Sequence, residues 1–134
     1  MAETQVSTRQ LNLTGFPKDI GIILTPAGEA IATGAVDYEW VASEGGTFTD
    51  FLLTVKTAPT GAPIDFDVKN NGTSIFTTRI TIDATETSSD TATTAFVINT
   101  ASFSRGDRIS FEFVGVGSTV AGADAQITLY YLRA

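Results

Sequence analysis

Carboxylates are the residues of this sequence best placed to do chemistry. Asp65 and Asp67 are two positions apart in an alternating stretch, so both side chains point to the same face of a strand. Asp83, Glu86 and Asp90 follow within one short segment of the chain. A pair of carboxylates can catalyse glycoside hydrolysis, and three carboxylates with backbone carbonyls can hold calcium.

The surroundings of these acids favour neither chemistry. No DxDxDG-type calcium loop is present, and the acids occupy positions that a solvated face or loop would give them. The chain has no cysteine and no histidine, which removes thiol nucleophiles, Ser-His relays and the usual zinc ligands. We therefore expect no enzyme, no metal site and no cofactor. A glycan hydrolase that uses Asp65, Asp67, Asp83 or Glu86 is the least favoured of three functional hypotheses.

Aromatic residues are the second candidates, because their flat apolar rings can stack on sugars. Trp40, Tyr130 and Tyr131 are possible exposed contacts of this kind. Tyr38 and Trp40 share a face with Val36, so the alternation favours core packing for these two rings. Tyr130 and Tyr131 are adjacent on a predicted strand and point to opposite faces, so one of them is expected to be exposed or at a subunit contact.

Two short motifs have a structural explanation. Arg105-Gly106-Asp107 is an RGD triplet, which can engage integrins in animal ligands, but Gly and Asp also suit a tight turn. The glycine-rich residues 115–122 lack the Lys-Ser/Thr of a phosphate-binding loop, and no helix is predicted after them. We interpret the first motif as a turn and the second as a loop.

Composition limits the class of protein and its partners. The chain has 134 residues, 43% of them hydrophobic and 17% charged, as in one ordinary folded domain. A net charge of −7 and scattered Lys and Arg disfavour nucleic acid and anionic membranes as partners. The first residues lack the apolar core of a signal peptide, and no apolar run approaches the roughly 20 residues that span a bilayer. We expect a soluble protein made in a cytoplasm.

Residues 54–82 organise the predicted fold. Ile64, Phe66 and Val68 alternate with charged residues, which predicts a half-buried strand. Asn71-Gly72 follows, and both residue types tolerate the positive φ angles of a type I′ hairpin turn. The apolar face then resumes at three isoleucines, Ile75, Ile80 and Ile82.

The remaining segments predict an antiparallel β-sandwich. Turn signals recur throughout, giving about eight to ten strands and no convincing helix. The predicted strands include residues 19–25, 35–42, 48–57, 95–98, 109–114 and 125–132. Residues 58–63 (APTGAP) suit a connection between two sheets. We divide the chain into an N-terminal arm, residues 1–18, and a β-sandwich domain, residues 19–134.

The C-terminal two thirds of the chain, roughly residues 40–132, resembles a β-sandwich module of tailed-bacteriophage virion proteins. The matching stretches are FLLTVKTAPTGAPIDFDVKNNGTSIF, RITIDATETSS and FSRGDRISFEFVGVGSTVAGADAQITLYYL, in this order. The resemblance implies a jelly-roll-like sandwich, often trimeric, that has no shared catalytic residue. Such modules serve as structural and recognition scaffolds in tail fibres, receptor-binding proteins and small capsid proteins.

The resemblance implies a virion location and leaves two roles open. A capsid decoration (cement) protein would be a homotrimer that binds the major capsid protein or other virion proteins. Its arm, through Leu11, Leu13 and Phe16, would lie across a neighbouring subunit. A tail-associated receptor-binding head would instead recognise a host surface glycan through exposed aromatic rings. We favour the first role, because the sequence encodes one small domain with an arm and neither a shaft nor an adaptor.

Overall fold

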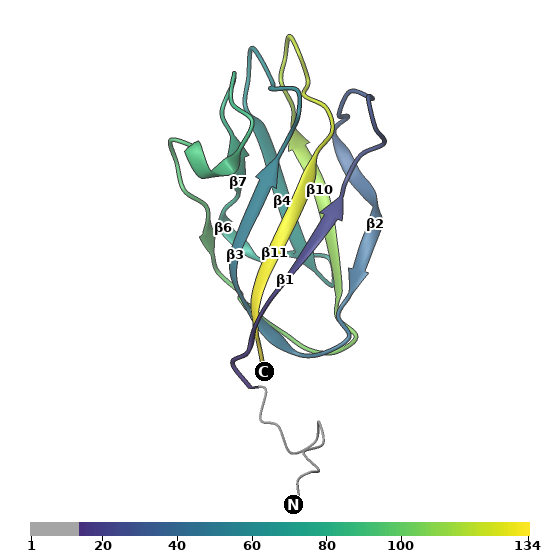
Figure 1. Cartoon of the computed structure of the whole chain (residues 1–134), viewed down its shortest axis with the longest axis vertical. Coiled ribbons are helices and arrows are strands. Elements are labelled where there is room, and N and C mark those ends of the chain that lie inside the picture. The colour runs from purple at the N-terminus through teal and green to yellow at the C-terminus, as the bar shows by residue number, and fades with distance from the viewer. Residues whose placement is uncertain (1–13) are drawn as a thin grey trace, which may run out of the picture.

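Two antiparallel sheets pack face to face in the computed structural model, which describes residues 14–134 (Figure 1). The first sheet has the order β1 (Pro17–Ile23), β11 (Gln126–Arg133), β3 (Gly46–Thr54) and β9 (Ser102–Phe103). The second has the order β2 (Gly34–Val41), β10 (Arg108–Gly115), β4 (Ile64–Asn70) and β5 (Thr73–Ser74), and β7 (Ile80–Ile82) also pairs with β4. The predicted all-β antiparallel sandwich is confirmed.

Three small elements of the described residues lie outside these sheets. β6 (Phe76–Thr78) pairs with β8 (Val97–Ile98), and a short 3-10 helix covers Ser89–Thr91. No α-helix occurs between residues 14 and 134, in agreement with the sequence prediction.

The first four strands alternate between the two sheets. Residues 58–63 belong to the connection from β3 in one sheet to β4 in the other, as the APTGAP composition predicts. Several long connections gather at one end of the sandwich, and the C-terminus and the start of β1 lie at the other end (Figure 1). Loops of distant sequence are therefore neighbours at each end.

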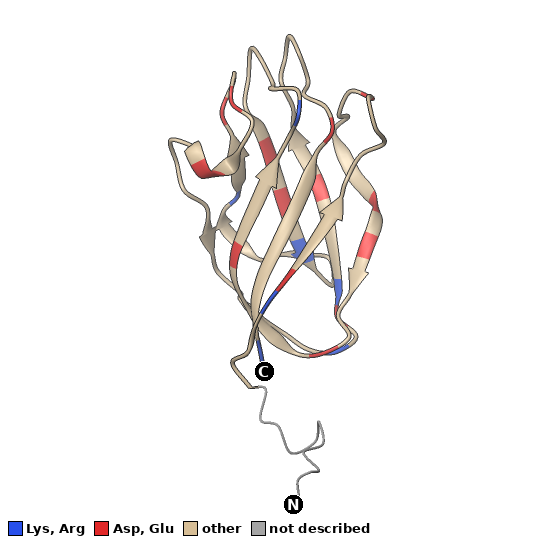
Figure 2. Cartoon of the chain, viewed as in Figure 1, with Lys and Arg blue, Asp and Glu red and all other residues tan. Residues whose placement is uncertain are grey.

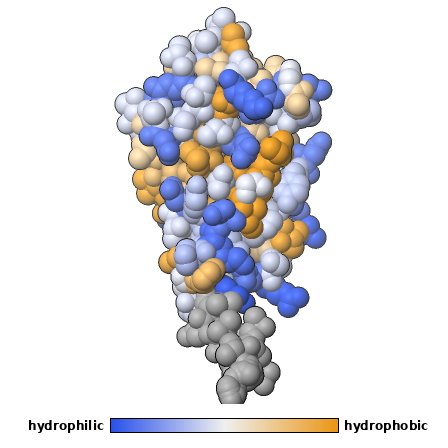
Figure 3. All heavy atoms as spheres, in the orientation of Figure 1, coloured by the Kyte–Doolittle hydropathy of each residue, from blue (hydrophilic) through white to orange (hydrophobic). Residues whose placement is uncertain are grey.

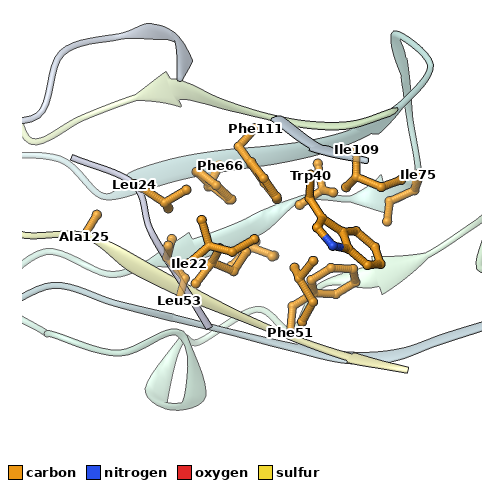
Figure 4. Close-up of a cluster of buried hydrophobic side chains, with 14 of the residues drawn as sticks. Ile22, Leu24, Trp40, Phe51, Leu53, Phe66, Ile75, Ile109, Phe111 and Ala125 are labelled. Carbon is orange, nitrogen blue, oxygen red and sulfur yellow. The ribbon is translucent and has the colours of Figure 1, made fainter. Parts of the chain in front are cut away.

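The core is formed by the inward-facing residues of both sheets. Ile64, Phe66 and Val68 of β4 have no exposed surface, which confirms the alternation on this strand. Figure 4 shows side chains of the two sheets meeting in the middle, including Ile22 and Leu53 from one sheet and Phe111 from the other. Each such side chain contributes about 1.5–3 kcal/mol through its removal from water.

Two irregular pairings change which residues face the core. Tyr130 pairs with Asp50 and Tyr131 with Phe48, so one extra residue of β3 bulges between them. This bulge allows Phe48 and Phe51, three positions apart, to be buried together.

The prediction that Tyr38 packs in the core is wrong, because its side chain is 47% exposed. The second irregular pairing explains the difference. The pairing of β2 with β10 shifts between Ser110 and Glu112, which face Glu39 and Ala35. Tyr38 lies inside that irregular stretch, so its side chain no longer follows the alternation set by Trp40.

The predicted Asn-Gly hairpin is present between β4 and β5. Asn71 has φ 50° and Gly72 has φ 90°, the positive angles that a type I′ turn requires. The returning chain is interrupted: it leaves the sheet after Ser74 to form β6 and rejoins β4 as β7. Ile75, Ile80 and Ile82 are all buried, as predicted.

Candidate functional site

The root of the predicted arm is attached to the last strand. The backbone N–H of Gly15 donates to the carbonyl oxygen of Arg133 at 2.5 Å, and the N–H of Arg133 donates to the carbonyl of Phe16 at 3.0 Å. The Phe16 side chain nevertheless stays 53% exposed. Of the three arm residues proposed from the sequence, Leu11 and Leu13 lie outside the described residues. The position of Phe16 is therefore set by backbone bonds while its ring remains available for contact.

Glu44, in the connection from β2 to β3, joins the strands beside this root. Its carboxylate accepts hydrogen bonds from Lys18 Nζ at 2.9 Å and from the Tyr131 hydroxyl at 2.8 Å, and Arg133 Nε lies 3.0 Å away. The hydrogen bond from Lys18 is the largest cause of the lowered pKa of Glu44, followed by that from Tyr131. Sequence patterns did not reveal this cluster, because its members come from three separate parts of the chain.

Trp40 and Tyr131 belong to the core rather than to the surface. They are 9% and 3% exposed, and both rings make edge contacts with Phe103, at centroid distances of 5.6 and 5.3 Å. Core packing, which the sequence favours for Trp40, is confirmed. The interpretation of Trp40 and Tyr131 as exposed contacts is wrong, because both are inward-facing residues of their strands.

Tyr130 faces outward and is partly exposed, which confirms that one of the two adjacent tyrosines points away from the core. Its neighbours across the sheet are Asp19 on β1 and Asp50 on β3, both exposed. Figure 3 shows this face of the four-stranded sheet, where hydrophobic surface occurs in separate spots among hydrophilic residues. The sheet thus presents an aromatic ring between two carboxylates.

The acids considered for catalysis have structural partners. Asp65 accepts two hydrogen bonds from Arg79, at 2.9 and 2.8 Å, and Asp67, only 4% exposed, accepts one from Ser74 Oγ at 2.6 Å. Asp83 accepts from the backbone and hydroxyl of Thr93. Glu86 accepts from Thr91 Oγ1. Among residues 14–134, no group of three or more His, Cys, Asp or Glu side chains is arranged to hold a metal ion.

Several basic side chains of the sandwich are paired with acidic ones. Five ion pairs link described residues, and the cations in them are Lys18, Lys69, Arg79, Arg108 and Arg133. Figure 2 shows the basic residues interspersed with acids rather than gathered into one stripe.

The RGD triplet forms a turn whose carboxylate folds back onto the Asn-Gly hairpin. Asp107 accepts hydrogen bonds from the Ser104 N–H at 2.9 Å, from Asn70 Nδ2 at 3.1 Å and from Asn71 Nδ2 at 3.2 Å. These bonds, that of the Ser104 backbone first, hold the pKa of Asp107 below its ordinary value. Asn71 completes the contact through both its backbone N–H and its side-chain oxygen, which bond to Arg108. We call this set of bonds the Asp107 clamp.

A shallow pocket of about 220 Å³ lies beside the Asp107 clamp. Its lining offers amides, hydroxyls and one carboxylate but no aromatic ring: Asn70, Asn71, Thr73, Ser74, Ile75, Thr100 and Asp107. The outward face around Tyr130 is therefore better equipped to stack on a sugar than this pocket is.

Comparison with known proteins identified no relative of this chain. No protein-family model matches this chain, and searches of curated proteins and of solved structures found no match. Within residues 14–134, no helix has the length and apolar character to cross a membrane.

Proposed function

We propose that this chain is a structural protein of a tailed-phage virion, a capsid decoration (cement) protein that binds across coat subunits. Two features support the proposal in addition to the resemblance of residues 40–132 to the phage module. The strand order β1-β11-β3-β9 facing β2-β10-β4-β7 is the order expected when a jelly roll folds into two sheets. The chain also enters β1 at the end of the sandwich that carries the C-terminus, where an N-terminal arm would leave the domain (Figure 1).

The observation that carries this function is the exposed Phe16 ring on a backbone tied to β11. A large apolar side chain at 53% exposure contributes little to the stability of the isolated domain. Gly15 and Phe16 are already held by backbone hydrogen bonds to Arg133. Binding of a partner over the Phe16 ring therefore costs little conformational entropy in this part of the chain. The root of the arm is thus suited to contact another subunit.

The proposed mechanism is mechanical. Packaged DNA presses coat subunits apart, and a protein bound across their junction adds buried surface that must be exposed before they separate. Stable specific interfaces bury about 1,200–2,000 Å². A homotrimer with closed three-fold symmetry would also cover the open edges of β1 and β2, which could otherwise pair with other chains.

The proposal is tested first by immunogold labelling of virions that carry the protein. Label over the head supports decoration, label at the tail tip supports receptor binding, and unlabelled particles would exclude both roles.

The arm is tested by binding to capsids that lack the protein. Deleting residues 1–13 and replacing Phe16 by Ser are both expected to weaken binding and to leave the unfolding transition unchanged. Val120→Ser is the matched control, because Val120 is a comparably exposed apolar residue (41%) in the connection between β10 and β11. Unchanged binding of both arm variants would exclude the arm as a coat contact.

The second candidate, a receptor-binding head that recognises a host glycan, is favoured by the outward face of the first sheet. There Tyr130 offers a ring for stacking, and the flanking Asp19 and Asp50 offer acceptors for sugar hydroxyls. Tyr130→Ala is expected to abolish adsorption of the phage without unfolding the protein. Normal adsorption of this variant would exclude Tyr130 as the receptor contact.

A further inference from the structure

Asn71-Gly72 is a sequence at which a backbone can modify itself. The backbone nitrogen of Gly72 can attack Cγ of Asn71, forming a carbon–nitrogen bond as the side-chain nitrogen leaves in ammonia. Water then opens the resulting succinimide and leaves an aspartate or an isoaspartate at position 71. Glycine favours the reaction because it has no Cβ to hinder the approach of its nitrogen.

The folded protein holds the reacting side chain in one orientation. Oδ1 of Asn71 accepts a hydrogen bond from the Arg108 N–H at 2.9 Å, and Nδ2 donates to Asp107 Oδ1 at 3.2 Å. A backbone N–H can only donate and a carboxylate can only accept, so these two partners determine which side-chain atom is oxygen. The Asn71 N–H also donates to the Arg108 carbonyl at 2.8 Å, which tethers the backbone at the same position.

We propose that the Asp107 clamp protects Asn71-Gly72 from deamidation, and that this peptide is a latent modification site that reacts when the clamp opens. The bonds to Asp107 and Arg108 restrain rotation of the Asn71 side chain. When the Gly72 nitrogen closes the ring on Cγ, Nδ2 leaves as ammonia and the bond from Asn71 to Asp107 is lost with it. Asn71 and Gly106 are 35 residues apart in the sequence. The chemical stability of the Asn-Gly hairpin therefore depends on a distant segment, the RGD turn.

The product would keep the clamp open. Deamidation replaces the Nδ2 donor by a carboxylate oxygen, which would then face the carboxylate of Asp107, and two like charges at this distance repel. An isoaspartate also adds a backbone carbon to a two-residue turn whose register depends on its length. Loss of the clamp would thus become permanent in a protein that is not renewed.

The experiment compares the folded wild-type protein with a synthetic peptide of residues 64–78, both kept in mildly alkaline buffer. Peptide mass spectrometry follows the mass increase of about one dalton at position 71 and separates aspartate from isoaspartate. We expect the folded protein to react severalfold more slowly than the peptide. Equal rates would overturn the proposal.

A pair of variants tests the role of the clamp itself. Asp107→Ala removes the acceptor of Asn71 Nδ2 and is expected to react severalfold faster than wild type while its circular dichroism remains that of a folded sheet protein. Asp83→Ala is the matched control, because Asp83 also accepts a backbone and a side-chain hydrogen bond but from Thr93. A folded Asp107→Ala protein that reacts at the wild-type rate would also overturn the proposal. If Asp107→Ala does not fold, the comparison of reaction rates between the folded wild-type protein and the peptide of residues 64–78 tests the proposal by itself.

Discussion

The hydroxyl of Tyr131 donates a 2.8 Å hydrogen bond to Oε2 of Glu44, so a buried ring of β11 is bonded to a carboxylate of the β2–β3 connection. Lys18 bonds to the same oxygen, and Arg133 pairs with the other. The first and last strands thus share one anionic partner, which the β2–β3 connection supplies.

Removing this hydrogen bond is expected to weaken the fold. Tyr131→Phe should lower the free energy of unfolding by about 1 kcal/mol, because the ring stays packed and only the bond to Glu44 is lost. Urea denaturation measures the effect. Tyr130→Phe is the matched control and should change little, because Tyr130 points outward; an equal loss in both variants would contradict the role of the Glu44 bond.

Alkaline pH should weaken the same contact. Burial, and then the bond to Glu44, raise the pKa of Tyr131 to about 12 from an ordinary value of 10.0. Because the folded-state pKa is the higher one, the stabilisation is complete below pH 10 and is lost as the pH rises towards 12. Tyrosinate absorbance of the wild type, set against Tyr131→Phe, should show one late-titrating tyrosine that the variant lacks.

Acid should act through Glu44 and Asp107. The pKa of each is lowered in the folded state, from 4.5 for Glu44 and 3.8 for Asp107, so each stabilises the fold above these values and loses its contribution as the pH falls through the folded-state pKa. Thermal unfolding across this range should show a smaller acid loss in Glu44→Gln and in Asp107→Asn than in wild type. If both variants lose as much thermal stability in acid as the wild type does, the loss must come from other carboxylates.

Gly117 should tolerate no side chain. A Cβ at this position would lie 1.8 Å from the Val120 carbonyl oxygen and 2.9 Å from the Thr60 nitrogen, and backbone atoms cannot move aside cheaply. Gly117→Ala is therefore expected to cost at least about 2 kcal/mol of stability. Gly115→Ala is the control, since its Cβ would meet only Asp65 Cβ at 3.5 Å; denaturant midpoints that shift equally would contradict the packing argument.

Trp40 and Tyr38 should differ sharply although they lie on one strand. Trp40→Ala removes a ring that is 9% exposed and packs on Phe48, Phe103 and Tyr131, at an expected cost of about 3–5 kcal/mol. Tyr38→Ala removes a 47% exposed ring and should cost less than about 1 kcal/mol. Chemical denaturation of both variants compares them directly, and similar losses would show that the irregular stretch of β2 does not isolate Tyr38 from the core.

Local patterns predicted the elements where one physical rule dominates. The burial of Ile64, Phe66 and Val68 follows from the two-residue period of a strand, and the positive φ angles at Asn71 and Gly72 follow from the residue types a tight hairpin accepts. The same rule is wrong at Tyr38, because a bulge depends on the partner strand and leaves no mark in the alternation of its own sequence.

The all-β class, the hairpin, the turn at Asp107 and most of the core can be predicted from the sequence, since they depend on periodicity and on backbone preferences of single residues. The folded arrangement was needed to find that Glu44 bonds to Lys18, Tyr131 and Arg133, and that Asp107 bonds to Asn71 across a separation of 36 residues. Hydrogen bonds between distant segments depend on how two sheets are stacked and registered, and no local pattern encodes that geometry.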